Sequence, residues 1–480
     1  MATLSIPQPR SEAPGRHTWL IAAFALFAGA AAGGYALAVG ELEALWAGLS
    51  IAACVAVLID YRLGAILLVL LLPISSTALF PHALMGMTGL NPMNLLLMAT
   101  LASFLARGHV GHPGPFVPRQ VLWLLVVPIA LAGLLGTTHF DDILPAFFDR
   151  MVVAFTTWRG YLGVTVVKPV LLVLAALLVA AAVAKARKPE SFVVALAAGA
   201  CALALLMIGF VAISDIRLGM LASPRARMFF SEIGAHANDF GRVFVTGYAL
   251  LLFTWWESKD ARARLALFVA LGILSLGILL TFSRNAYLGF FLVNGLFLLW
   301  KFNMKKLGLA LLGTAVAAAL APGAVYRRIT YGFDSGSADT VSAGRIEGLW
   351  LPLLPETLKS PLWGQGLDSI MWSDTMALGA MEMAGHPHNA YLQAVLDMGV
   401  IGLVLLLAYY WHVWRNFRAL GSNPYLTPPM RGFFQGACAA LLAFAAACMT
   451  GGSLRPQADN VLLWIAIGIM YGLLVRKPKS

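Results

Sequence analysis

Charged residues are scarce in this chain. Only 11% of its 480 residues are Asp, Glu, Lys or Arg, while 60% are hydrophobic. A soluble domain ordinarily carries about 25% charged residues, so the composition excludes a globular protein with a water-facing surface. The mean hydropathy of +0.82 agrees with this conclusion. The chain is therefore predicted to be a membrane protein that crosses the bilayer many times.

Cysteine is also rare, with four residues in the whole sequence. Cys54, Cys201, Cys438 and Cys448 all fall within apolar runs, and none of them has the C-x-x-C spacing of a metal site. This pattern indicates neither a disulfide framework nor a zinc site. We therefore expect all four cysteines to be core residues.

Several cofactor motifs are missing from the sequence. It has no Walker A loop, no dinucleotide-type glycine fingerprint and no acidic triad with metal-binding spacing. We therefore expect no cofactor and no bound metal, so that the energy for any reaction must come with a substrate. Lys and Arg outnumber Asp and Glu by 33 to 22, but they lie between the apolar runs, which argues against a nucleic-acid partner.

What the chain does contain is a series of apolar runs. Most are about 17 to 24 residues long, which matches an α-helix that crosses a hydrocarbon core about 30 Å thick. About fourteen candidate spans lie at residues 18 to 38, 43 to 59, 63 to 79, 92 to 107, 120 to 137, 164 to 184, 190 to 213, 238 to 256, 265 to 282, 285 to 301, 307 to 321, 389 to 413, 432 to 451 and 458 to 475. Pro73 interrupts the third run, and Ser283-Arg284 alone separates the ninth from the tenth. We predict an all-α fold with about 12 to 14 transmembrane helices.

The loops indicate how the chain is oriented. Cytoplasmic loops hold an excess of Lys and Arg, and the basic clusters alternate as expected if both termini are cytoplasmic. The first apolar run then fits a retained signal anchor better than a cleaved signal peptide. The chain divides into transmembrane helices 1 to 11 at residues 1–321, a large periplasmic loop with short helices at 322–388, and C-terminal transmembrane helices at 389–480.

Four arginines of the predicted outer face are candidate site residues, at positions that the bias toward basic inner loops disfavours. They are Arg225, Arg227, Arg284 and Arg345. The planar guanidinium group binds phosphate oxygens in pairs and keeps its charge in a partly dry site, so these residues suit a lipid-linked diphosphate. Alternatively, Arg225 and Arg227 extend toward lipid headgroups, and Arg345 pairs with Glu347 or Asp339.

A second polar cluster, His386-Pro387-His388-Asn389, lies where the large loop meets the next apolar run. Neutral imidazole has a pKa near 6.5 and can accept a proton from a hydroxyl group, so either histidine is a candidate general base. His388 and Asn389 are alternatively the N-terminal cap of the helix that follows. The sequence does not distinguish between His386 and His388, although the rigid helix start favours His388 slightly.

Together these motifs resemble the O-antigen ligase and polymerase superfamily. The resemblance covers roughly residues 280 to 405. It is carried by Ser283-Arg284, Gly344-Arg345 with Trp350, Pro361-Leu362-Trp363-Gly364-Gln365-Gly366, His386-Pro387-His388-Asn389-Ala390-Tyr391-Leu392-Gln393 and Asp397-Met398-Gly399-Val400-Ile401-Gly402. The combination is specific, whereas each motif alone is not.

The resemblance implies a glycosyltransferase of the bacterial inner membrane with a periplasmic active site. Its donor would be a glycan linked to undecaprenyl diphosphate, and its acceptor lipid A-core, in a metal-independent, inverting transfer in lipopolysaccharide biosynthesis. The family's functional residues would fall on His388 or His386 and on Arg284 as catalytic groups. The diphosphate-binding residues would be Arg284, Arg345 and either Arg225 or Arg227, and the supporting residues Asn238, Asn389, Gly364 and Gly366.

Other functions remain open at this level. A Wzy-type polymerase of O-antigen or exopolysaccharide and a protein O-oligosaccharyltransferase would use the same chemistry. A transporter or flippase for lipid-linked glycans would also need arginines for the diphosphate. Such a transporter should show ionisable residues near the middle of its spans, or internal repeats with broken helices. The sequence shows neither clearly, which favours the enzyme.

Overall fold

The structure is a computed structural model and describes residues 42–78, 80–84, 87–108, 114–214, 216, 220, 229–301, 308, 323–330, 333 and 336–476. Two expected spans, 18 to 38 and 307 to 321, lie outside the described residues, as do Arg225 and Arg227. The chain forms two compact units, one of residues 1–68 and 80–111 and the other of residues 69–79 and 112–480.

The described part of the chain is helical apart from one short antiparallel ladder, in which β1 (Ala83–Leu84) pairs with β2 (Met87–Thr88). Among these residues, six helices are long and apolar enough to cross a membrane. They are Arg119–Thr137, Trp158–Lys185, Glu190–Ile213, Ala261–Leu280, Ala390–Gly421 and Pro428–Ala447. The prediction of an all-α, multi-pass membrane protein is confirmed.

The first unit contains α2 (Leu42–Ile59), the start of α3 (Tyr61–Leu71), α4 (Pro92–Ser103) and the π-helical turn η1 (Phe104–Gly108). Helix α3 ends two residues before Pro73. Proline has no backbone N–H to donate and its ring clashes with the preceding turn. The expected break in the third apolar run is therefore present.

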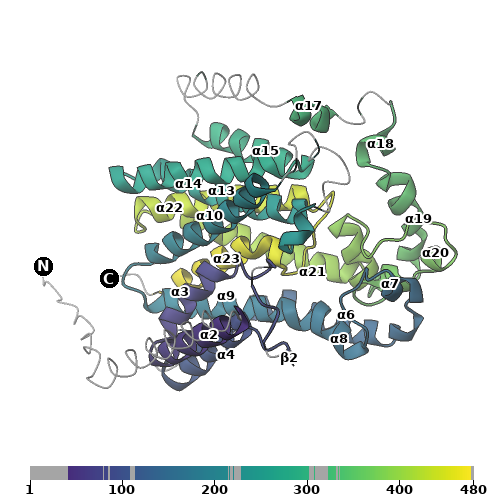
Figure 1. The fold of residues 1–480 in the computed structure, drawn as a ribbon, viewed down its shortest axis with the longest axis horizontal. Coiled ribbons are helices and arrows are strands. Elements are labelled where there is room, and N and C mark those ends of the chain that lie inside the picture. Colours follow the sequence, from purple (N-terminus) through teal and green to yellow (C-terminus); the bar gives the residue numbers. More distant parts are fainter. Residues whose placement is uncertain are drawn as a thin grey trace, which may run out of the picture. The chain divides into compact units, whose positions relative to one another are not determined.

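The second unit is built around α13 (Ala237–Glu257), which packs against α14 (Ala261–Leu280), α15 (Arg284–Trp300) and α22 (Pro428–Ala447) (Figure 1). Glycine allows the closest of these contacts. A Cβ atom on Gly436 would lie 2.4 Å from the Ala249 carbonyl oxygen, and one on Gly432 would lie 2.3 Å from that of Phe253. Small residues at helix interfaces let backbones approach, which is how helices associate within a membrane.

The second unit also contains helices that belong neither to that core nor to the large loop. Helix α9 packs on α23, and α10 packs on α14. Their bounds are α5 (Arg119–Val121), η2 (Leu122–Val126), α6 (Val127–Thr137), η3 (Phe140–Asp142), α7 (Pro145–Asp149), α8 (Trp158–Leu162), η4 (Gly163–Val167), α9 (Lys168–Lys185), α10 (Glu190–Ile213), η5 (Phe230–Ile233) and, at the end of the chain, η10 (Ala458–Asn460) and α23 (Val461–Leu474).

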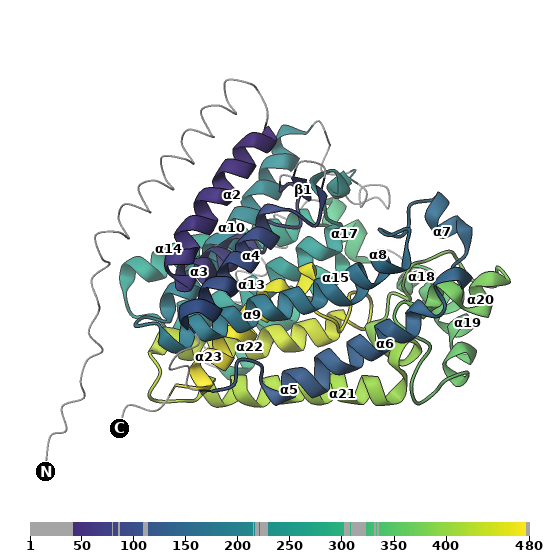
Figure 2. The ribbon, with the colours of Figure 1, turned by 90° about the horizontal axis from the view of Figure 1, so that it is seen from below.

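The described part of the large loop folds into short helices, as predicted. They are α17 (Gly323–Thr330), α18 (Ala338–Ser342), η7 (Ile346–Trp350), α19 (Leu351–Leu353), η8 (Pro355–Leu358), η9 (Ser369–Trp372) and α20 (Asp374–Ala377). The chain then enters α21 (Ala390–Gly421), which runs beside α6 (Figure 2).

Helix α21 is broken near its start. Gly399 adopts φ 66° and ψ −174°, which leaves the backbone groups around it without helical partners. The loop segment 361–366 supplies those partners. Gln365 N donates to Leu396 O at 2.9 Å, Gly366 N donates to Asp397 O at 3.0 Å, and Val400 N donates to Pro361 O at 2.8 Å. A helix break at membrane depth is tolerated when other protein groups satisfy its backbone in this way.

Gly364 and Gly366 make this close approach possible. Both have positive φ, 73° and 99°. A Cβ atom on Gly364 would lie 2.3 Å from the carbonyl carbon of Asp397, and one on Gly366 would lie 2.5 Å from Gly136 Cα. Two motifs that were distant in the sequence, one at 361–366 and one at 397–402, therefore form a single structural unit that holds the start of α21.

Candidate active site

The start of α21 is capped by Asn389. Its side-chain oxygen accepts hydrogen bonds from the backbone N–H groups of Tyr391 and Leu392, both at 3.1 Å. Asparagine is among the best residues for this position because it satisfies donors that the first helical turn leaves open. Asn389 is thus the N-terminal cap of this helix, and the two histidines lie just before the cap.

His386 and His388 form a contacting pair. Their ring centroids lie 4.1 Å apart with an interplanar angle of 68°. His388 has φ 52°, an uncommon conformation for a residue other than glycine. Between them, Pro387 O accepts a hydrogen bond from Trp350 Nε1 at 2.8 Å. This contact ties the pair to η7 of the large loop.

One hydrogen bond distinguishes the two imidazoles. The backbone N–H of His388 donates to Nδ1 of His386 at 3.2 Å. A neutral imidazole carries one proton, and a nitrogen that accepts a hydrogen bond is the unprotonated one. Neutral His386 therefore carries its proton on Nε2 and can donate from that atom. This arrangement favours His388 over His386 as the group that accepts a proton.

Positive charge surrounds His386. His386 as a whole is exposed to solvent. Loss of bulk water lowers its pKa from the ordinary 6.5, the guanidinium groups of Arg242, Arg345 and Arg455 lower the pKa further, and the Asp368 carboxylate opposes them. Both desolvation and neighbouring cations disfavour a charged imidazole. The fold thus favours the neutral form of His386.

Arg345 lies where the large loop meets the segment between α22 and η10. Its backbone N–H donates to Ser342 Oγ at 3.1 Å, and its guanidinium Nη1 donates to Thr450 O at 2.6 Å. Asp339, one of the partners considered from the sequence, instead accepts the backbone N–H of Glu347 at 2.9 Å. The Arg345 guanidinium group also lowers the pKa of His386, so the structure links these two predicted residues electrostatically.

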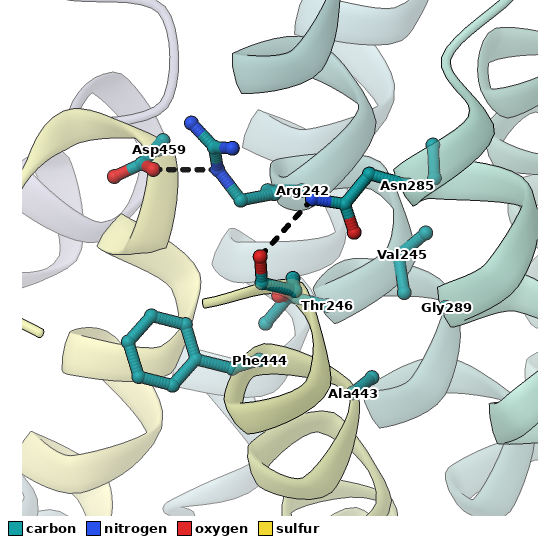
Figure 3. A pocket seen from close by; sticks show the side chains of 10 residues that line it. Arg242, Val245, Thr246, Asn285, Gly289, Ala443, Phe444 and Asp459 are labelled. Carbon is teal, nitrogen blue, oxygen red and sulfur yellow. Dashed lines mark hydrogen bonds and ion pairs between the residues drawn. The ribbon is translucent and has the colours of Figure 1, made fainter. Parts of the chain in front are cut away.

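Arg242, in the first turns of α13, was not predicted. It forms ion pairs with Asp239 at 2.6 Å and with Asp459 of η10 at 2.6 Å, and its side chain is 11% exposed (Figure 3). An arginine near the end of a membrane-length apolar run marks a functional position by default. That signal is present in the sequence, where Arg242 lies within the apolar run at 238 to 256 rather than in a loop.

A small cavity lies beside Arg242. Its polar lining comes from Arg242, Thr246, Asn285 and Asp459, and its apolar lining includes Phe444 and Ala443 from α22 and Val245 from α13 (Figure 3). The accessible volume of about 10 Å³ is close to what a single water molecule needs. The cavity is therefore lined by charged groups but is too small to hold a glycan.

Arg284 is the first residue of α15, and Asn238 helps to hold that helix start. Ser283 caps α15, since its Oγ accepts from Ala286 N at 3.3 Å, and it donates to Asn238 Oδ1 at 2.7 Å. Asn285, next to Arg284, donates to Ala447 O at 3.2 Å. Asn238 therefore has a structural role that links the starts of α13 and α15. A direct role of Arg284 in binding a substrate stays a prediction.

A second charged cluster, which the sequence did not predict, consists of Arg455, Asp368 and Asp397. Arg455 pairs with the Asp368 carboxylate, which also accepts a hydrogen bond from Gln393 Nε2 at 2.9 Å. Asp397 accepts from the backbone N–H of Ser369 at 3.1 Å. Arg455 and Asp397 are 5% and 2% exposed. The cluster joins the loop, α21 and the segment before η10, and its members come from sequence regions that no short motif connects.

Metal-ligating residues do not gather in the described part of the chain. Those residues include no group of three or more His, Cys, Asp or Glu side chains that could hold a metal ion. The four cysteines are all described and free, two of them buried and two partly buried.

Comparison with known proteins bears on residues 269–407. This stretch matches the Wzy_C family model, whose description is O-antigen ligase. Over these residues the chain is similar to the Wzy_C family. No curated protein matches the chain. The Wzy_C match includes Arg284, Arg345, both histidines and the 361–366 segment, so the resemblance stated from these residues is confirmed. Arg242, Arg455 and Asp459 lie outside the match.

Proposed function

We propose that this protein is a periplasmic O-antigen ligase, which transfers a glycan from undecaprenyl diphosphate to lipid A-core. The observation that carries the proposal is the arrangement around His386. A histidine pair lies at the start of a membrane-spanning helix, and the guanidinium groups of Arg242, Arg345 and Arg455 lower the pKa of His386. A base beside several fixed cations is what displacement of a diphosphate leaving group by a hydroxyl requires.

In the proposed reaction, His388 accepts the proton of an acceptor hydroxyl group. The hydroxyl oxygen forms a bond to the anomeric carbon while the bond from that carbon to the diphosphate oxygen breaks. Undecaprenyl diphosphate leaves with the electron pair, and the single displacement inverts the anomeric centre. His386, neutral and protonated on Nε2, donates a hydrogen bond to the acceptor sugar or to the donor phosphate.

The arginines stabilise the leaving group in this mechanism. Arg345 and Arg284 bind diphosphate oxygens, together with Arg225 or Arg227 of the preceding outer segment. Arg242 is already engaged by two carboxylates, so its proposed role is to contribute positive potential and to hold Asp459 in place. Fixed donors aimed at developing charge commonly contribute about 3 to 4 kcal/mol each to lowering a barrier.

The proposed topology places both termini in the cytoplasm and the site in the periplasm. Residues 1–321 and 389–480 then form the transmembrane part, and residues 322–388 form the periplasmic loop above it. The basic residues Arg415 and Arg418, in the last turns of α21, support the inside location of that helix end.

The decisive experiment supplies purified protein in proteoliposomes with undecaprenyl-diphosphate-linked glycan, with and without lipid A-core. Glycan on lipid A-core, formed only when the core is present, supports the ligase. Longer lipid-linked chains in the absence of core would instead identify a polymerase. Movement of intact lipid-linked glycan across the bilayer without any new glycosidic bond would identify a transporter. The His388→Ala variant is the matched control for the chemical step.

A further inference from the structure

The segment of the large loop from Leu351 to Trp363 has an inverted distribution of polar and apolar side chains. Leu351, Leu354 and Leu358, spaced along one face of consecutive helical turns, are 54%, 51% and 76% exposed. Glu356, between them, is 3% exposed. A helix over water would expose the glutamate and bury the leucines.

Polar contacts hold Glu356 inside, close in sequence to Leu353, which is fully buried. Glu356 Oε1 accepts hydrogen bonds from the backbone N–H of Thr375 at 3.0 Å and from its hydroxyl at 2.8 Å. Glu356 Oε2 pairs with Lys359 Nζ at 2.7 Å, and Lys359 pairs with Asp374 at 2.6 Å. Because these interactions hold the glutamate inside, the leucines face outward as a consequence of the fold.

Helix α21 carries an exposed stripe of the same kind. Val400, Val404, Leu407 and Trp411 are 47%, 55%, 42% and 62% exposed, and their spacing places them on one face of the helix. The next exposed residues on that face are Arg415 and Arg418. An apolar stripe that ends in arginines is the lipid-facing side of a membrane-spanning helix whose basic end reaches the membrane surface.

The two apolar surfaces are continuous. Val400 N donates to Pro361 O, and Ile401 N donates to Leu362 O at 3.3 Å, so the loop segment lies directly against the upper end of the stripe. Leu362 and Trp363 are 55% and 68% exposed there. The exposed apolar surface of α21 therefore continues onto the loop at Leu362 and Trp363.

The depth of this junction follows from helix geometry. At about 1.5 Å per residue, Val400 stands about 22 Å along the helix from Arg415. A hydrocarbon core is about 30 Å thick, so with Arg415 at the inner surface, Val400 and its neighbours Leu362 and Trp363 remain within the core. Any tilt of α21 would place them deeper.

We propose that residues 351–363 are immersed in the outer leaflet of the membrane, with lipid acyl chains covering Leu351, Leu354, Leu358, Leu362 and Trp363. The large loop is then not wholly in the periplasm but enters the bilayer beside α21, and the Wzy_C-matched segment between Arg345 and the histidines has a lipid-facing side. This inference concerns the surface and is independent of the proposed transfer reaction.

The test measures the surroundings of spin labels on the full chain in lipid nanodiscs that hold one copy each. The four native cysteines are replaced with alanine, and single cysteines are introduced as Leu358→Cys and Leu362→Cys. Val404→Cys on α21 is the control for hydrocarbon, and Asp374→Cys, whose native side chain is 72% exposed, is the control for water. Collision rates with oxygen and with a water-soluble nickel chelate are measured for each label.

Labels at 358 and 362 are expected to resemble the label at 404, with the ratio of oxygen to nickel collisions at least several-fold higher than at 374. A ratio at 358 and 362 equal to that at 374 would show that the segment faces water and would overturn the proposal. Protection from both collision partners would also overturn it, because protein rather than lipid would then cover the patch. Loss of glycan transfer in any variant does not bear on either outcome.

Discussion

The backbone N–H of His388 donates a hydrogen bond to Nδ1 of His386 across 3.2 Å. The bond assigns different chemistry to two side chains that the sequence presents as equivalent. His386 becomes a donor through Nε2, while the His388 ring is left as the candidate base. Because the donor is a backbone group, replacing the His388 side chain leaves this bond in place, so single substitutions can separate the two roles.

We expect His388→Ala to lower kcat by about 10²- to 10⁴-fold, the usual contribution of a general base. His386→Ala should cost less, about 10-fold or a little more, because it removes one hydrogen-bond donor. Initial rates of glycan transfer in proteoliposomes measure both. The assignment is wrong if His388→Ala retains most of its activity while His386→Ala loses it.

The charge environment of His386 predicts its protonation. Its pKa lies below the ordinary 6.5 because of desolvation and the neighbouring guanidinium groups. Reaction of neutral imidazole with diethyl pyrocarbonate, followed by mass spectrometry across pH, should therefore give a midpoint below 6.5 for His386. Arg345→Ala removes a positive charge that disfavours protonation, so the midpoint should move upward in that variant. A downward shift, or a wild-type midpoint above 6.5, would contradict this account.

The two carboxylates that hold Arg242 should contribute unequally to stability. Asp459 is 5% exposed and Asp239 is 39% exposed. Breaking a buried ion pair by removing one partner typically costs about 3 to 5 kcal/mol because it leaves a buried charge uncompensated. Asp459→Asn should therefore lower the Tm in nanodiscs clearly more than Asp239→Asn, the matched control. Equal decreases in Tm for the two variants would show that the ion pair with Asp459 stabilises the protein no more than the ion pair with Asp239.

Gly364 should tolerate no side chain. Gly364→Ala would place Cβ 2.3 Å from the Asp397 carbonyl carbon, a backbone atom in the broken part of α21. Gly379 has a similar positive φ of 65°, but a Cβ atom there would meet no other atom within 4 Å, so Gly379→Ala isolates the cost of the backbone conformation, about 1 to 2 kcal/mol. We expect Gly364→Ala to destabilise the protein further, by about 1 to 3 kcal/mol for overpacking. Thermal unfolding of the two variants in parallel measures the difference.

Arg345 should be sensitive to the shape of its side chain as well as to its charge. Arg345→Ala is expected to lower kcat by about 10²-fold or more, in line with the loss of one fixed donor to a developing charge. Arg345→Lys keeps the charge but loses the planar fork, so it should recover part of the rate. Full activity of the alanine variant would remove Arg345 from the proposed diphosphate site.

The helices were the most predictable part of this protein. The expected span at 190 to 213 coincides with α10, and that at 238 to 256 differs from α13 by one residue at each end. Such runs are set by local composition and length, since a segment that crosses a bilayer must satisfy its own backbone. The histidines, Arg284 and Arg345 were also accessible from the sequence because they belong to short contiguous motifs.

The charged groups behind those motifs were not accessible in the same way. Arg242 and Asp459 meet only because α13 packs against η10, and Arg455 meets Asp368 through the placement of the large loop. No local pattern specifies which of many polar residues at helix ends will pair. Their pairing depends on how the helices pack, which a single sequence does not state.

By itself, the sequence determined that the chain is a multi-pass helical membrane protein, because the length of an apolar run is a local property. It also determined the resemblance of its histidine and arginine motifs to those of O-antigen ligases, because these motifs are contiguous in the chain. The tertiary structure alone decided which imidazole nitrogen accepts the His388 backbone N–H, and which charged side chains act on His386. It also decided how Gly364 and the break at Gly399 fit together. These features depend on contacts between distant segments, where hydrogen-bond geometry and close packing select one arrangement from many that the same residues would allow.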